Sequence, residues 1–284
     1  MKKLLLTLTS IMMMLAAQAQ LTEIYGPYYG GSLFVNKGNL YNSDDYRADS
    51  FQKYQLTPNF AGQLELGYLF ENGFSIAGCV QFATCNQKYK GADPYYAFTL
   101  TANTKSSFIK LPFIISHQTR NDKLLKFIYS VGFYYALTLG YSDQYTIDAI
   151  DPASADFTTS ISKGLMTTTN SLTKDKTSYA IRDNIFNTHG LGALAGAGIS
   201  YRFKEKVEFI AQFRTEMHLT NVENTSENVV SPTDGTPGFP QYKNLYGNYA
   251  KYMSVPDNNY RRAQTRPINM GINLGLRFYK FRTI

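Results

Sequence analysis

An eight-stranded antiparallel transmembrane β-barrel, with short periplasmic turns and long extracellular loops, is the all-β fold that this sequence predicts. Three observations lead to it. Eight segments alternate apolar and polar residues with a period of two, as strands with one apolar and one polar face do. The connections between these segments are alternately short and long. The chain also starts with a segment typical of exported proteins.

The first nineteen residues are interpreted as a cleavable signal peptide. Lys2 and Lys3 precede an apolar run over residues 4–17, and Ala17-Gln18-Ala19 fits the small-residue rule for cleavage. The rest of the chain, residues 20–284, is expected to form one barrel domain. It has no apolar run of about eighteen residues, so no transmembrane helix is expected. The 23 Tyr, 19 Phe and 21 Gly suit strands and turns, which favours the bacterial outer membrane over the periplasm or secretion.

The net charge is mildly basic and scattered along the chain. The full sequence has 28 Lys and Arg against 21 Asp and Glu, which gives +7, and removing Lys2 and Lys3 leaves 26 − 21 = +5. Nucleic-acid binding would require a basic stripe, and none is visible. Nucleic acid is therefore not an expected partner.

The eight predicted strands cover residues 25–36, 58–70, 74–88, 105–117, 124–141, 189–203, 207–221 and 267–281. The connections after the second, fourth and sixth strands are short, at residues 71–73, 118–123 and 204–206. The other four have roughly 21, 16, 47 and 45 residues. Short turns on one side and long loops on the other are typical of outer-membrane barrels, whose turns face the periplasm.

The first short turn sets the register of its hairpin, because Gly73 can take a positive φ in a three-residue loop. The resulting pairs are Phe70–Phe74, Tyr68–Ile76 and Leu64–Val80 on the apolar face, and Glu65–Cys79 and Gln63–Gln81 on the polar face. Apolar residues therefore meet apolar residues, and polar residues meet polar ones.

The apolar faces are expected to point outward. If they pointed inward, an interior barely wide enough for modest side chains would have to hold seven large ones. These are Tyr129, Phe133, Tyr135, Phe209, Phe213, Met270 and Phe278. In the hairpin over residues 192–217, a Phe203–Val207 pairing instead sets Gly196 opposite Arg214 and Gly198 opposite Gln212, so that long polar side chains face glycine. A polar interior and an apolar exterior require lipid outside.

Aromatic residues near the short turns support this orientation, because a girdle of aromatic residues marks a membrane interface. They are Tyr68, Phe70, Phe74, Tyr201, Phe203 and Phe278. The alternative is a soluble lipocalin-like or sandwich protein. Soluble barrels bury their apolar face and rarely alternate turn length so regularly.

Seven charged residues fall on the predicted inner face. They are Glu65, Lys110, Arg202, Glu208, Arg214, Glu216 and Arg277. Four bases against three acids are nearly balanced, so we expect paired, hydrogen-bonded groups that fill the barrel rather than an open pore. Buried ions persist when they are paired, which favours a structural network over a proton relay or catalysis.

Two further residue patterns affect the strands. Cys79 and Cys85 lie six residues apart in one strand, about 20 Å along it. A disulfide spans at most about 7 Å between Cα atoms, so these two thiols are not expected to bridge each other. Pro112 removes a backbone donor in the middle of the fourth strand and suggests a bulge or a local break.

Five short motifs on these strands resemble the PorT-like outer-membrane β-barrel family of Gram-negative bacteria. They are Gly30-Gly31-Ser32-Leu33, Gly62-Gln63-Leu64-Glu65-Leu66-Gly67-Tyr68, Phe108-Ile109-Lys110-Leu111-Pro112, Val131-Gly132-Phe133 and Gly275-Leu276-Arg277-Phe278. The resemblance implies an eight-stranded barrel that the barrel assembly machinery inserts. Some members of the family are linked to type IX secretion, so it also implies secretion-system proteins as partners.

Few residues are candidates for catalysis or metal binding. His117 falls at a periplasmic turn and His189 at a strand end, while His218 shares the inner face with Glu216. A lipid-active triad would face the membrane instead, so no enzyme, catalytic residue or cofactor is expected. Two acidic loop clusters match no EF-hand spacing, so no metal site is expected. They are Asp44, Asp45 and Asp49, and Asp148, Asp151 and Asp156.

The last long loop carries a candidate surface-binding site. Its tyrosines are spaced four, three and three residues apart and would form one aromatic stripe on a helix. With the flanking bases they are Tyr242, Tyr246, Tyr249, Tyr252, Lys243, Lys251, Arg261 and Arg262. Such a stripe suits a glycan, a lipopolysaccharide phosphate or a partner protein. The other interpretation is that the tyrosines pack on neighbouring loops and cap the barrel mouth.

Three functions follow from these predictions, in order of preference. The first is a non-enzymatic structural or accessory component of the cell envelope, which the resemblance links to protein secretion. The second is a surface binding or adhesion protein that acts through its extracellular loops. The third is a narrow channel, which a charge-filled lumen of eight strands disfavours. Expected partners are outer-membrane lipid and lipopolysaccharide, and the barrel assembly machinery during insertion.

Overall fold

The computed structural model describes residues 25–41, 52–93, 98–119, 124–149, 157–162, 165–170, 176–180, 187–204, 206–222 and 264–280. Structural statements below concern these residues. The predicted signal peptide lies outside them. No helix among them has both the length and the apolar character that crossing a membrane requires.

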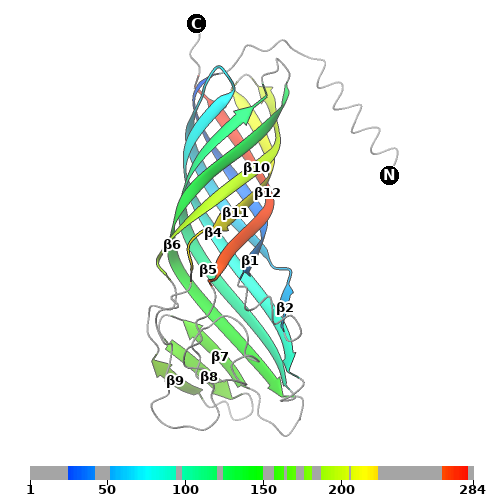
Figure 1. The fold of residues 1–284 in the computed structure, drawn as a ribbon, viewed down its shortest axis with the longest axis vertical. Coiled ribbons are helices and arrows are strands. Elements are labelled where there is room, and N and C mark those ends of the chain that lie inside the picture. Colours follow the sequence, from blue (N-terminus) through cyan, green and yellow to red (C-terminus); the bar gives the residue numbers. More distant parts are fainter. Residues whose placement is uncertain are drawn as a thin grey trace, which may run out of the picture.

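Eight antiparallel strands in this part of the chain close into a barrel (Figure 1). They are β1 (Gly26–Tyr41), β3 (Pro58–Leu69), β4 (Phe74–Asp93), β5 (Phe98–Gln118), β6 (Leu125–Ala149), β10 (His189–Lys204), β11 (Val207–His218) and β12 (Arg266–Tyr279). Each strand pairs with its neighbours in chain order, and β1 closes the circle against β12. The predicted fold class is therefore confirmed.

Four shorter strands extend this sheet beyond the loop end of the barrel (Figure 1). β2 (Gln52–Gln55) pairs with β4, and β7 (Phe157–Ser162), β8 (Leu165–Asn170) and β9 (Lys176–Ala180) continue from β6. The sequence predicts loops here, so that prediction is wrong for these segments. The predicted length of the second long loop is wrong as well. β4 and β5 extend further than predicted, and only residues 94–97 separate them.

The barrel has a definite stagger. The strand pairing can be followed once around from Tyr279 through Tyr28, Gly67, Ala77, Ile114, Gly132, Leu194 and Glu216. The path returns to β12 at Asn269, a displacement of 279 − 269 = 10 residues. Such a stagger makes the strands of a closed barrel tilt by about 35–45° from its axis. A row of paired residues followed around the barrel is therefore displaced from the short-turn end towards the loop end.

Side chains are distributed inside out relative to a soluble protein. Leu33 and Phe133 on the outer surface are 67% and 61% exposed, whereas Gln81 and Lys110 on the inner surface are 0% exposed. A broad apolar exterior of this kind is stable only in contact with lipid. The predicted orientation of the two faces is therefore confirmed.

The interior is less polar than the sequence predicts. Tyr28, Phe34 and Tyr134 are buried inside the barrel. Glycines on neighbouring strands make the room, because a Cβ added at Gly192 or Gly67 would overlap the ring of Tyr134 or Tyr28. The prediction counted the volume of the outer face and left these compensating glycines out.

The first hairpin has the predicted register. Gly73 has φ of 83°, and Phe70 donates its backbone N–H to the carbonyl of Phe74 at 2.8 Å. The other predicted pairs, which include Tyr68 with Ile76 and Glu65 with Cys79, are all present. A three-residue turn with one positive φ thus fixes which residues of β3 and β4 share a face.

Replacing Gly73 by alanine is expected to cost about 1 to 3 kcal/mol of folding free energy, because a side chain is strained at this φ. The added Cβ would also lie 2.5 Å from the carbonyl oxygen of Gln118. Urea unfolding in detergent, followed by far-UV circular dichroism, measures the loss. Gly62→Ala is the control, since a Cβ there meets nothing within 4 Å. Equal stabilities of the two variants would contradict the strain.

One local prediction needs correction, and for Pro112 the structure has one of the two predicted alternatives. Phe203 does not pair with Val207, because a bulge between Arg202 and Lys204 lets Lys204 take that place. The remaining β10–β11 register, with Gly196 opposite Arg214, is as predicted. Pro112 causes a local break rather than a bulge: the β4–β5 pairing stops between Gly78–Phe113 and Gln81–Lys110 and resumes without a shift, since 78 + 113 = 81 + 110.

Candidate functional site

The candidate site is the polar interior, where strand alternation places every charge that the sequence assigns to the inner face. Six of the seven are buried and Glu65 is nearly so, with 10% of its side chain exposed. They come from five strands and are Glu65 of β3, Lys110 of β5, Arg202 of β10, Glu208, Arg214 and Glu216 of β11, and Arg277 of β12. Buried charges of this kind need partners inside the barrel.

Glu216 is the centre of an ion cluster in the half of the barrel nearer the long loops, the loop-side cluster. One carboxylate oxygen lies 2.6 Å from Nζ of Lys110, and the other lies 2.8 Å from a guanidinium nitrogen of Arg214. Gln81 donates a hydrogen bond of 3.0 Å to the latter oxygen. Arg214 and Glu216 are two residues apart on β11, so both point inward. This cluster ties β11 to β4 and β5 across the lumen.

The loop-side cluster is completed by polar and aromatic groups. Arg214 donates to the side-chain oxygen of Gln63 at 2.9 Å. Nζ of Lys110 lies 4.7 Å from the ring centre of Tyr134, and the Arg214 guanidinium lies 5.7 Å from that of Phe34. A cation over an aromatic ring gains electrostatic energy that is larger where water is excluded.

A second cluster, the turn-side cluster, lies nearer the short turns. Arg277 donates to Glu65 at 2.7 Å and lies 4.6 Å above the ring of Tyr28. Glu208 accepts hydrogen bonds from the Tyr279 hydroxyl at 2.5 Å and from Gln118 at 3.2 Å.

Arg202 is paired with Glu208 in the β10–β11 ladder. Residues paired in a ladder share a face of the sheet, so Arg202 brings its positive charge to the same inner surface as Glu208.

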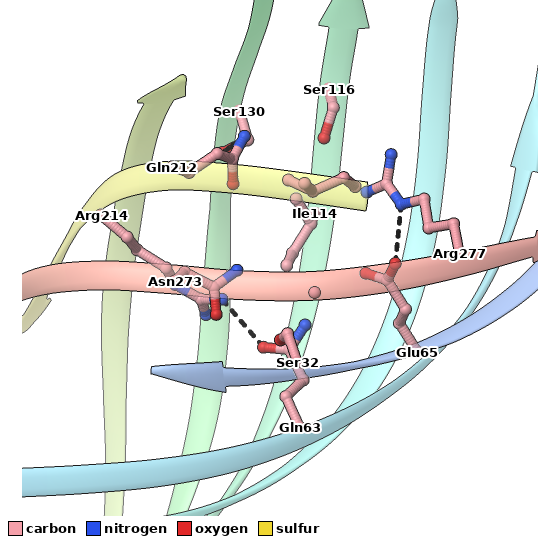
Figure 2. A pocket seen from close by; sticks show the side chains of 12 residues that line it. Ser32, Gln63, Glu65, Ile114, Ser116, Ser130, Gln212, Arg214, Asn273 and Arg277 are labelled. Atoms are coloured by element: carbon pink, nitrogen blue, oxygen red, sulfur yellow. Dashed lines mark hydrogen bonds and ion pairs between the residues drawn. The ribbon is translucent and has the colours of Figure 1, made fainter. Parts of the chain in front are cut away.

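A small cavity separates the two clusters (Figure 2). Its volume is about 20 Å³, room for roughly one water molecule. Ser32, Gln63, Glu65, Ile114, Ser116, Ser130, Ile210, Gln212, Arg214, Asn273, Gly275 and Arg277 line it. In Figure 2 the Glu65–Arg277 and Gln63–Arg214 contacts flank this space. Side chains of both clusters thus face this space within the described interior.

The three histidines lie at separate places. His117 packs on Phe74 with ring centres 4.6 Å apart, and His189 lies on the outer surface 2.5 Å from the hydroxyl of Tyr135. His218 is buried between the rings of Phe108 and Tyr134, with centres 5.4 and 5.3 Å away. Within the described chain neither ring nitrogen of His218 has a hydrogen-bond partner. Glu216 and His218 therefore form no acid–base pair.

Replacing His218 by phenylalanine is expected to raise the free energy of unfolding by about 1 kcal/mol. The variant keeps the aromatic packing and removes buried nitrogens whose desolvation nothing offsets. The unfolding midpoint in urea checks the stability, and mass spectrometry of cell-envelope glycolipids checks for lost lipid modification. A fall in stability would show that a His218 nitrogen has a partner.

No group of three metal-ligating side chains occurs in the residues that the structure describes. Cys79 and Cys85 are buried and free, as predicted from their spacing. Of the acidic loop clusters, Asp148 lies in β6, and the other residues lie outside the described ranges.

The tyrosine-rich loop cannot be placed, because Tyr242, Tyr246, Tyr249, Tyr252, Arg261 and Arg262 lie outside the described ranges. Sequence reasoning missed the exposed lysines where β4 and β5 leave the barrel, Lys88, Lys90 and Lys105. Their signal was available: each keeps the outward phase of its strand beyond the last apolar residues.

No family model and no curated protein matches this chain. Among solved structures, it is similar to Neisserial surface protein A, at 13% identity and a TM-score of 0.37, over 90% of this chain and 99% of that one. It is also similar to the outer-membrane protein OprG from Pseudomonas aeruginosa, at 9% identity and a TM-score of 0.34, over 93% and 100% of the two chains. Both likenesses are too weak to say what this chain does, and the PorT-like resemblance stays a prediction.

Proposed function

We propose that this protein is an integral outer-membrane β-barrel that neither conducts nor catalyses, and that it serves the cell envelope as a structural or accessory component. The observation that carries the proposal is the reversed distribution of side chains, with apolar residues outside and paired charges inside. An exterior of this composition requires a bilayer. The ion pairs of the interior connect strands across the lumen and stabilise the barrel. In this proposal the same side chains leave no path for solutes.

The lumen favours a structural role over a channel. Tyr134, Lys110 and Glu208 are 0–1% exposed and come from three different strands. Substrate-conducting barrels need a water-filled interior, which eight strands can hardly enclose. The described side chains fill the width that such a barrel has.

Conductance and fractionation test this function together. The purified barrel is expected to shift in electrophoretic mobility on heating, to fractionate with the outer membrane, and to give no steady current in planar bilayers. A porin serves as the positive control for current. Reproducible conductance steps would support the channel instead, and a chain that stays in the soluble fraction would remove the membrane assignment altogether.

The extended sheet favours a second candidate, a surface-binding or adhesion role. β2 and β7 to β9 lengthen the sheet outside the barrel, and such an extended sheet suits the presentation of binding loops. Deleting residues 241–262 is expected to abolish cell-surface binding of glycan or protein while the barrel still inserts. Binding that survives this deletion would leave the loop without that role.

A link to protein secretion rests on the PorT-like resemblance and has its own test. The extracellular and surface proteomes of a deletion strain and its parent are compared. Secreted cargo retained in the periplasm would support an accessory role in secretion. An unchanged secretome would leave the structural role and the surface-binding role.

A further inference from the structure

Three exposed lysines lie together where β4 and β5 leave the barrel, and we call Lys88, Lys90 and Lys105 the outer lysine patch. Lys105 is paired with Asn86, and Lys88 is paired with Asn103. Lys88 and Lys105 are therefore diagonal neighbours on adjacent strands, about 7–8 Å apart. Lys90 follows on the same face of β4.

The outer lysine patch begins just beyond the apolar belt. On β4 the outward residues Phe74, Val80 and Phe82 are 48%, 55% and 52% exposed. Lys88 lies fourteen residues beyond Phe74 (88 − 74 = 14), which is about 35 Å along the barrel axis at the usual rise and tilt. The apolar band of outer-membrane barrels is about 25 Å tall. Lys88 therefore lies about 10 Å outside the hydrocarbon layer, at the depth of lipid headgroups.

The patch carries one sign of charge. Among acids whose side chains the structure describes, Glu65, Glu208 and Glu216 lie inside the barrel, and Glu71 lies in a turn at the other end. Like charges directly opposite each other destabilise a sheet, and the diagonal pair Lys88 and Lys105 repels in the same way over a longer distance. A phosphate group accepts hydrogen bonds from several ammonium groups at once and would relieve this repulsion.

We propose that the outer lysine patch binds a phosphate group of a phosphorylated glycolipid in the outer leaflet, as found in lipopolysaccharide. The acyl chains of such a lipid lie against Phe82, Ile109 and Leu111, the first apolar outward residues that follow the polar Thr84, Asn86 and Ser107 towards the bilayer. Charge and apolar surface then meet the two halves of one amphipathic molecule. The proposal rests on the outer-membrane location proposed above, and it deepens it by naming the lipid and the residues that hold it.

The test uses the full chain in micelles of a zwitterionic detergent, titrated with diphosphorylated lipid A and followed by native mass spectrometry. The double variant Lys88→Gln/Lys105→Gln is expected to bind about thirtyfold more weakly, since each basic residue near an anionic surface contributes about a factor of five. Lys88→Arg/Lys105→Arg should bind as the wild type does. Lys37→Gln/Lys280→Gln, which removes one exposed charge from β1 and one directly after β12, should also bind normally.

Several outcomes would overturn the site. Equal binding of dephosphorylated lipid A would show that phosphate is not recognised, and equal competition by inorganic phosphate would show that the lipid is not. A loss as large in Lys37→Gln/Lys280→Gln would show a general effect of net charge. The heat-dependent mobility shift is recorded for every variant. If the Lys88→Gln/Lys105→Gln variant keeps the mobility shift and binds lipid A as the wild type does, this inference fails while the proposed function stands.

Discussion

Replacing Glu216 by glutamine is expected to lower the free energy of unfolding by about 3 to 5 kcal/mol, because removing one partner leaves buried charges without compensation. Glu216 holds both Lys110 and Arg214, and the side chains of all three are at most 3% exposed. The chain has no tryptophan, so far-UV circular dichroism in urea and the heat-dependent mobility shift measure the folded fraction.

Two controls separate pairing from a general effect of mutation. Glu71→Gln removes the same charge from an exposed turn and should change stability by less than about 0.5 kcal/mol. Lys110→Met leaves Glu216 paired with Arg214 and should cost less than Glu216→Gln. A Glu216→Gln barrel with the midpoint of the wild type would mean that these ion pairs do not stabilise the fold.

Replacing Leu33 by arginine is expected to cost about 2 to 4 kcal/mol in a bilayer, the penalty for a charge on the lipid face near the membrane centre. Leu33 is 67% exposed on β1 and is paired with Leu274 and Gly62. In water the same exposed position would tolerate arginine within about 0.5 kcal/mol. Urea unfolding in lipid vesicles therefore reports whether this surface meets lipid.

Leu56 supplies the matched control. It is 74% exposed, but it precedes β3 at the loop end of the barrel. Arginine near the interface costs only about 0 to 1 kcal/mol, so Leu56→Arg should unfold almost as the wild type does. Equal losses at Leu33 and Leu56 would mean that depth does not matter and would contradict the membrane-spanning assignment.

Much of the barrel could be predicted because its strands face two very different solvents. Alternation at Leu64, Glu65 and Leu66 reports lipid on one side and lumen on the other, and one tight turn at Gly73 then fixes the register. The same physics places the seven inner charges, since only one face of each strand can hold them. Which acid meets which base is decided by the stagger of the barrel, which no single strand contains.

The sheet outside the barrel could not be predicted for a related reason. Beyond the bilayer both faces of β7 and β8 lack the lipid that makes a strand alternate, and half of residues 157–170 are Thr or Ser. A polar segment of this kind is as compatible with a loop as with a strand. Its pairing is a property of the long β6 edge beside it. The bulge between Arg202 and Lys204 was missed because the turn residues 204–206 are all charged. They contain no apolar residue that would mark the register of the hairpin.

The pairing of β1 with β12 sets an order of events during biogenesis. These strands come from opposite ends of the chain and pair from Tyr28–Tyr279 to Tyr41–Arg266. Until residue 279 has been exported, the partly assembled sheet has two unpaired edges that can join other chains. A chain that lacks residues 266–279 therefore leaves β1 and β11 without the strand that joins them. Closure of the barrel therefore requires residues 266–279, whichever strands pair before them.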